Sequence, residues 1–115
     1  MVQGQAAWIM RKETLPEAAG GLEETVPILE ALGSVTRQRI LLLFEPGEQI
    51  NIKNVAEQFN LSRTAVVHHI GVLQEAGVLK GERVGKEVIM YVDWNTVTRT
   101  LGRVLAFIKE KYGVE

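Results

Sequence analysis

The stretch "RTAVVHHIGVLQEAG", residues 63–77, contains both histidines of a chain that has no cysteine. If this stretch is a helix, adjacent residues lie about 100° apart around its axis, so His68 and His69 point in different directions. They therefore do not form the pair of histidines, four residues apart, that binds a metal ion on one helix face. We expect no metal site and no cofactor.

The two histidines are predicted to have different roles. His68 falls on the outward side of the helix, where contact with a phosphate or a base edge of DNA is favoured over plain exposure to solvent. His69 falls nearer the core, and we expect a partly buried histidine that positions the helix.

The polar residues just before the histidines indicate nucleic-acid recognition. Ser62 is a predicted helix cap first and a phosphate contact second. Arg63 and Thr64 come in the first turn, which is the part of a recognition helix that approaches base edges. An arginine there can donate two hydrogen bonds to guanine. The alternative for Arg63 is an ordinary solvated side chain.

Catalysis has little support in this sequence. It contains no cysteine nucleophile, no glycine-rich phosphate loop and no HExxH-like metal pair. Ser62 and His69 lie seven residues apart, and the serine is better explained as a cap. We expect a protein that is not an enzyme.

Four predicted helices precede the wing, at about residues 22–33, 34–45, 51–60 and 63–76. Pro46 and Gly47 end the second, whose run at residues 40–44 is apolar nearly all round and is expected to be buried. The third and fourth are joined by about three residues, which is the spacing of a helix-turn-helix. Thr25, Asn51, Ser62 and Asp93 are predicted helix caps, and Asn60 is predicted to end the third helix in the left-handed conformation.

Residues 78–93 predict a β-hairpin directly after the helix-turn-helix, which is the position of a wing. Each half contains β-favouring residues, and Gly85 supplies the unusual backbone angles that the turn requires. Arg83 and Lys86 fall at or near the tip. Contact with phosphate is favoured over a merely charged tip.

The last helix, about residues 94–112, carries an apolar seam with steps of three and four residues. Its members are Trp94, Val97, Leu101, Val104 and Ile108. Together with Trp8 and Ile9 of the N-terminal arm, they predict a subunit interface. A ligand pocket near Trp8 and Trp94 is the alternative. We therefore divide the chain into an arm (1–21), a core (22–93) and a C-terminal dimerisation helix (94–115).

Length and composition indicate one small globular domain. The chain has 115 residues, 46% of them hydrophobic, and a net charge of −1. No apolar run approaches the roughly 18 residues that cross a bilayer, and the N-terminus does not look like a signal peptide. We expect a cytoplasmic protein that does not associate with membranes. Near-neutral charge means that DNA binding would depend on local geometry.

Two segments resemble the ArsR-type winged-helix repressors. "LEALGSVTRQRILLLF" is similar to the helix pair that opens this family, and "NVAEQFNLSRTAVVHHIGVLQEAGVLKGERVGKEVIMYV" is similar to its helix-turn-helix and wing. The resemblance covers about residues 22–95. It implies a mostly helical α+β fold, a winged helix-turn-helix with N- and C-terminal dimerisation helices, and a homodimer that represses transcription by binding a double-stranded DNA operator.

Carried over residue by residue, the resemblance places seven residues at DNA-facing positions. They are Ser62, Arg63, Thr64, Val67 and His68 on the recognition helix and Arg83 and Lys86 in the wing. Two positions depart from the family pattern, because Val67 replaces the usual serine and Gly71 replaces a commonly basic or polar residue. The residues that form the family's two common metal sites are also missing, although Asp93 is kept.

Two alternatives to the repressor hypothesis stay open. Near-neutral charge, Val67 and Gly71 favour a winged-helix module that docks a protein and binds DNA poorly. A pocket at the dimer interface would instead indicate a regulator that responds to an unknown small-molecule effector.

Overall fold

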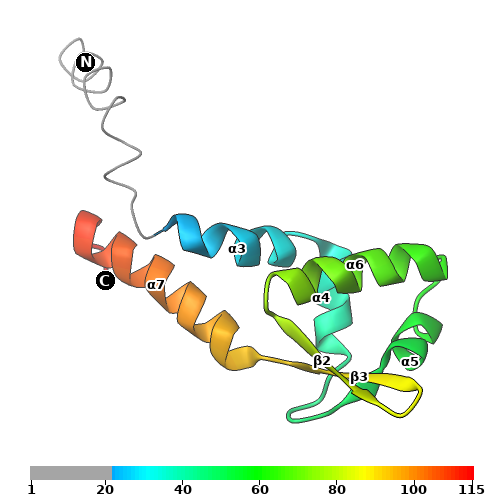
Figure 1. Cartoon of the computed structure of the whole chain (residues 1–115). Helices are drawn as coiled ribbons and strands as arrows, with labels where there is room; N and C mark the ends of the chain where they lie inside the picture. The colour runs from blue at the N-terminus through cyan, green and yellow to red at the C-terminus, as the bar shows by residue number, and fades with distance from the viewer. Residues whose placement is uncertain (1–21) are drawn as a thin grey trace.

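The computed structural model describes residues 22–115, so Trp8, Ile9 and the rest of the predicted arm lie outside the described residues. It has the predicted mostly helical α+β architecture, a winged helix-turn-helix followed by a long C-terminal helix (Figure 1). The elements follow in the order η1 (Glu23–Thr25), α3 (Val26–Leu32), α4 (Val35–Leu42), β1 (Ile50–Asn51), α5 (Ile52–Glu57), α6 (Arg63–Glu75), β2 (Leu79–Val84), β3 (Glu87–Val92) and α7 (Trp94–Tyr112).

The core lies where α3, α4, α5 and α6 meet the base of the sheet. Its most completely buried large side chains are Ile40, Ile70, Leu73, Leu79, Met90, Val55, Val66 and Val78. The prediction of a buried run at residues 40–44 is only partly correct, because the side chain of Leu42 is 76% exposed. One side of α4 packs against α3 and α6, and Leu42 points away from that side.

Capping side chains fix the start of most helices. The side-chain oxygens of Asn51 and Ser62 accept hydrogen bonds from the backbone N–H groups of Asn54 (2.7 Å) and Ala65 (3.1 Å), as predicted. The prediction for Thr25 is wrong, because its hydroxyl donates to the carbonyl of Leu22. The prediction for Asn60 is also wrong, since only glycines have positive φ angles among residues 22–115.

The wing is a three-stranded antiparallel sheet in the order β1–β3–β2. Strands β2 and β3 pair from Leu79 opposite Val92 to Val84 opposite Glu87. Only two residues, Gly85 and Lys86, connect them, and Gly85 has a φ of 64°. A two-residue hairpin turn favours positive φ because this backbone twist matches that of the strands. The predicted hairpin and the role of Gly85 are confirmed.

Helix α7 begins one residue after β3 and extends away from the winged core (Figure 1). It ends at Gly113, whose φ of 63° is the left-handed conformation that glycine adopts without steric cost. None of the helices in residues 22–115 is both long and apolar enough to cross a membrane.

Candidate nucleic-acid interface

Helix α6 presents a polar face to solvent because its opposite face is anchored in the core. Val66, Ile70 and Leu73 are buried, as the spacing predicts. The predicted DNA-facing residues Ser62, Arg63, Thr64, Val67 and His68 are all exposed. The predicted orientation of the helix is therefore confirmed, and contact of these residues with DNA stays a prediction.

His69 is half-buried and contacts Arg37, a residue of α4. Arg37 Nη1 lies 3.2 Å from His69 Nδ1. The same guanidinium donates from Nε to the carbonyl of Ala31 (2.7 Å) and from Nη2 to that of Glu30 (3.0 Å). Arg37 thus connects the carboxyl end of α3 to His69 on one side of α6.

The Arg37–His69 contact also defines the protonation state of the histidine. Arginine has only donors, so Nδ1 of His69 is the acceptor and its ring is neutral, with the proton on Nε2. Burial lowers the pKa of His69 from 6.5, and the neighbouring positive charge of Arg37 and the His68 ring lower it further. A neutral ring in this position matches the predicted positioning role.

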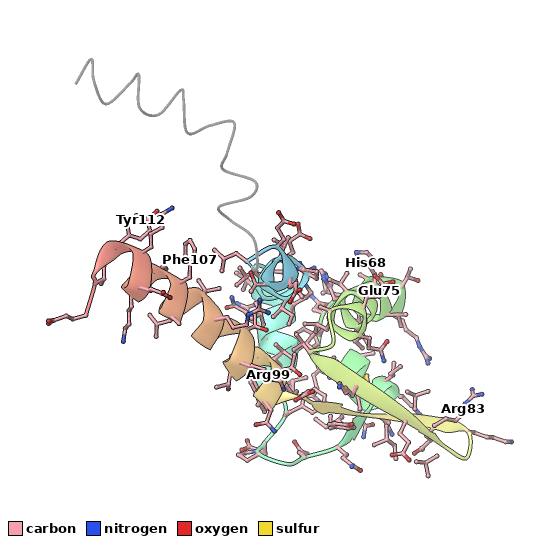
Figure 2. All side chains as sticks on the ribbon, turned by 60° about the vertical axis from the view of Figure 1, so that its left-hand side comes forward. His68, Glu75, Arg83, Arg99, Phe107 and Tyr112 are labelled. Carbon is pink, nitrogen blue, oxygen red and sulfur yellow. The ribbon has the colours of Figure 1, made fainter. Side chains whose placement is uncertain are left out.

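The wing supplies the second part of the candidate interface. Arg83 and Lys86 are exposed at its tip, where the sequence placed them. Figure 2 shows Arg83 at the free end of the wing, in the half of the molecule that also holds His68. Phe107 and Tyr112 lie at the far end of α7 (Figure 2). Two exposed glutamates, Glu82 and Glu87, flank the basic tip, so its net attraction for phosphate is modest.

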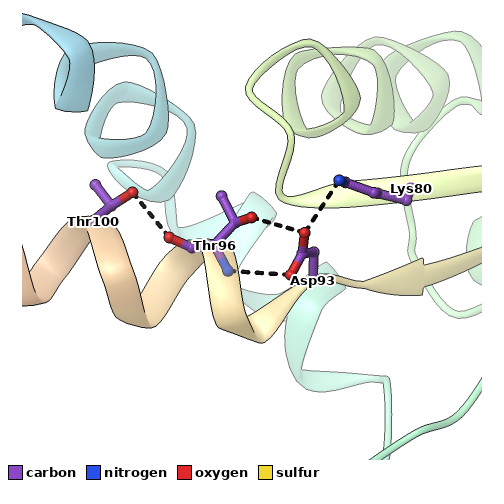
Figure 3. Close-up of polar contacts among 4 residues, drawn as sticks. All are labelled: Lys80, Asp93, Thr96 and Thr100. Carbon is purple, nitrogen blue, oxygen red and sulfur yellow. Dashed lines mark hydrogen bonds and ion pairs between the residues drawn. The ribbon is translucent and has the colours of Figure 1, made fainter.

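Asp93 joins the wing to α7 (Figure 3). Its carboxylate accepts hydrogen bonds from the backbone N–H (3.1 Å) and hydroxyl (2.7 Å) of Thr96, and lies 3.2 Å from Lys80 Nζ. The hydrogen bonds from Thr96, followed by the contact with Lys80, lower the pKa of Asp93 to about 2. The carboxylate is therefore fully engaged as a helix cap. No group of three or more metal-binding side chains occurs within residues 22–115.

One side of α7 carries an exposed apolar row. Its members are Trp94, Leu101, Leu105, Ile108 and Tyr112, hereafter the α7 stripe. At 100° per residue these positions fall within about 60° of one another around the helix. Leu105, which the sequence-based seam omitted, belongs to the α7 stripe because it lies one turn after Leu101. Val104 is half-buried at its margin.

Val97 differs from its predicted place in the subunit interface. Its side chain is only 5% exposed and belongs to the core of the single chain, together with the buried Thr100 beside it. The first turns of α7 pack against the winged core. The periodic pattern of apolar residues did not distinguish the side of α7 that faces this core from the side that faces solvent. The members of the predicted seam that the described chain leaves exposed are Trp94, Leu101 and Ile108.

Comparison with known proteins identifies relatives that share this geometry. A family model described as a helix-turn-helix domain matches residues 32–82. The transcriptional repressor SdpR of Bacillus subtilis is 26% identical over 83 residues, which cover 72% of this chain and 91% of the repressor. A putative arsenical resistance operon repressor, ArsR, of Halobacterium salinarum is 35% identical over 77 residues, which cover 64% of this chain and 60% of that protein.

The chain is similar to the ArsR family of helix-turn-helix transcriptional regulators. Among solved structures, a homodimeric winged helix-turn-helix DNA-binding domain of Mycobacterium bovis, a possible ArsR-family regulator, superposes with a TM-score of 0.62 at 15% identity. The alignment covers 84% of this chain and 90% of that one. The likeness is to transcriptional regulators and not to enzymes.

Proposed function

We propose that the chain is a homodimeric repressor that binds a two-fold symmetric DNA operator. In this proposal α6 enters the major groove with its first turn, and the tip of the wing contacts the neighbouring backbone. The observation that carries the proposal is the outward face of α6, which is exposed along Ser62, Arg63, Thr64, Val67 and His68 while three buried residues and Arg37 hold the opposite side.

The α7 stripe supports the homodimer. Five large apolar side chains aligned on one helix are costly to leave in water, and a second copy of the same helix would cover them by a self-complementary contact. Two recognition helices held by such a dimer would enter successive major grooves about 34 Å apart. The homodimeric domain from Mycobacterium bovis supports the proposed dimer. The repressor SdpR supports repression, rather than activation, of transcription.

Fluorescence anisotropy on a labelled random duplex, titrated with salt, tests the proposal. Contacts with phosphate predict binding at low salt that weakens linearly on a logarithmic scale as salt rises. Selection of bound sequences from a random pool would then give the operator, for which we expect two inverted half-sites. Absence of binding at the lowest salt would overturn the proposal in favour of a protein-docking module.

The variant Arg63→Ala tests the direction in which α6 enters the groove. If Arg63 binds a guanine, this variant should tolerate any base at one position of each half-site, at a cost of about 1–3 kcal/mol for the original operator. An unchanged base preference would contradict this contact. Glu75→Ala, at the opposite end of the exposed face of α6 (Figure 2), is the matched control and should leave the preference unaltered.

A further inference from the structure

Val67 occupies the middle of the outward face of α6. Its side chain is 44% exposed, although it stands among polar neighbours. Thr64, one turn earlier, and His68, the next residue, are both exposed beside it. Valine is branched at Cβ and stiff in a helix, so its two methyl groups are held in fixed directions.

The next turn of the same face is open. At Gly71, an added Cβ atom would meet no other heavy atom within 4 Å outside the local backbone. Gly71 therefore leaves the position one turn after Val67 without a side chain, and the exposed side chains of Gln74 and Glu75 follow only in the next turn. A groove wall can approach the second turn of α6 closely enough for the methyl groups of Val67 to contact it.

The chemistry of Val67 restricts what it can recognise in a major groove. Its side chain has neither donor nor acceptor, so it cannot satisfy the polar edge of guanine, cytosine or adenine. Thymine is the only one of the four DNA bases that presents a methyl group in the major groove. Contact between these methyl groups removes apolar surface from water on both sides.

We propose that Val67 recognises the C5-methyl group of a thymine in each operator half-site. This inference rests on the proposed function, because it specifies what the outward face of α6 reads in DNA. Arg63 and Thr64 would read polar edges with the first turn, and Val67 would read an A·T pair with the second. The operator then contains one thymine per half-site whose methyl group contributes directly to affinity.

Replacement of thymine by deoxyuridine tests the proposal, because it removes the methyl group and keeps every hydrogen-bonding group of the base pair. Each thymine of the selected operator is replaced in turn, and the dissociation constant is measured by anisotropy. Loss of one buried methyl contact should weaken binding about fourfold at one thymine, and about fifteenfold when both half-sites are changed.

The variant Val67→Ala tests whether Val67 is the residue that contacts the methyl group of thymine. It should bind the thymine and the deoxyuridine operators equally well, whereas the unaltered chain distinguishes them. Val35→Ala is the matched control, since Val35 is an exposed valine (66%) on α4, and this variant should keep the full difference. Because Val67 is exposed, Val67→Ala should unfold at the same temperature as the unaltered chain.

Two outcomes overturn the inference while leaving the proposed function in place. The first is an operator bound tightly in which no thymine-to-deoxyuridine change affects affinity. The second is a methyl effect that persists in Val67→Ala, which would assign it to another residue such as Thr64. Failure to bind any duplex at low salt is a different result, because it removes the proposed function itself.

Discussion

Arg37 Nη1 donates to His69 Nδ1 across 3.2 Å, and this contact joins two residues that are 32 positions apart in the chain. The guanidinium also binds two carbonyls at the carboxyl end of α3. One side chain therefore fixes the recognition helix relative to the helices that precede it. Together with the buried side chains of Val66, Ile70 and Leu73, this link holds the outward face of α6 at its angle to the rest of the molecule.

Arg37→Ala should lower the free energy of unfolding by about 2 kcal/mol, because hydrogen bonds from a charged donor are lost and carbonyls are left without their partner. Urea unfolding followed by circular dichroism measures the change. Arg39→Ala is the control, since Arg39 is exposed on the same helix, and it should change stability by less than about 0.5 kcal/mol. Equal effects of the two variants would show that the contacts of Arg37 are not structural.

Protonation of His69 should destabilise the fold. Its pKa is lowered in the folded state, so the unfolded chain binds a proton more readily. The stability that this difference provides is fully present above pH 6.5 and is lost as the pH falls below it. His69→Gln, which cannot titrate, should show a flatter dependence of the urea midpoint between pH 7.5 and pH 5. A slope unchanged in His69→Gln would contradict the assignment.

Asp93 should control stability in a separate, more acidic range. Its pKa falls from 3.8 to about 2 on folding, so its contribution is complete above pH 3.8 and is lost as the pH falls towards 2. Asp93→Asn keeps a capping oxygen but removes the charge that faces Lys80. Its urea midpoint should be lower than that of the unaltered chain at pH 7, and the two midpoints should converge near pH 2. A constant difference at every pH would exclude titration of Asp93 as the cause.

Leu101→Glu should separate the proposed dimer. Leu101 lies within the α7 stripe, where a second copy would bury the new carboxylate without a partner. We expect a shift from dimer to monomer in sedimentation velocity at micromolar concentration. Arg99→Glu introduces the same side chain about 160° away around α7, and this variant should remain dimeric (Figure 2). A dimer that survives Leu101→Glu would place the interface elsewhere.

Lys86→Ala should weaken binding to all DNA sequences equally. A phosphate contact carries no sequence information, so its loss should reduce the slope of log affinity against log salt by about one unit for each protomer. Lys109→Ala removes the same charge near the far end of α7 and should leave the slope unchanged. If the two variants behave alike, the wing tip does not contact the backbone.

The features that the sequence predicted correctly are local ones. The bounds of α6, the caps Asn51 and Ser62 and the turn at Gly85 depend on residues within a few positions of one another. The buried stripe of α6 followed from helical spacing for the same reason. Each of these signals is complete within one element or one turn, so no knowledge of the rest of the fold was needed.

The features that were missed depend on which elements become neighbours. Val97 and Leu42 are both apolar, yet α7 buries the first against the core and α4 leaves the second in solvent. The partner of Arg37 lies on a helix far along the sequence, and no spacing rule connects the two. The one available signal was the motif "TRQRI", in which the resemblance to the family places an arginine at this position.

The single-residue connection at Asp93 has a consequence for how an effector could act. Val92 ends β3 and Trp94 begins α7, while the backbone N–H of Asp93 donates to the carbonyl of Val78 at 2.8 Å. This short, hydrogen-bonded connection couples the orientation of α7 to that of the wing. In the proposed dimer, a change in the angle between the two α7 helices would therefore move both wing tips. The distance between the tips, and with it the length of DNA between their contacts, would change as well.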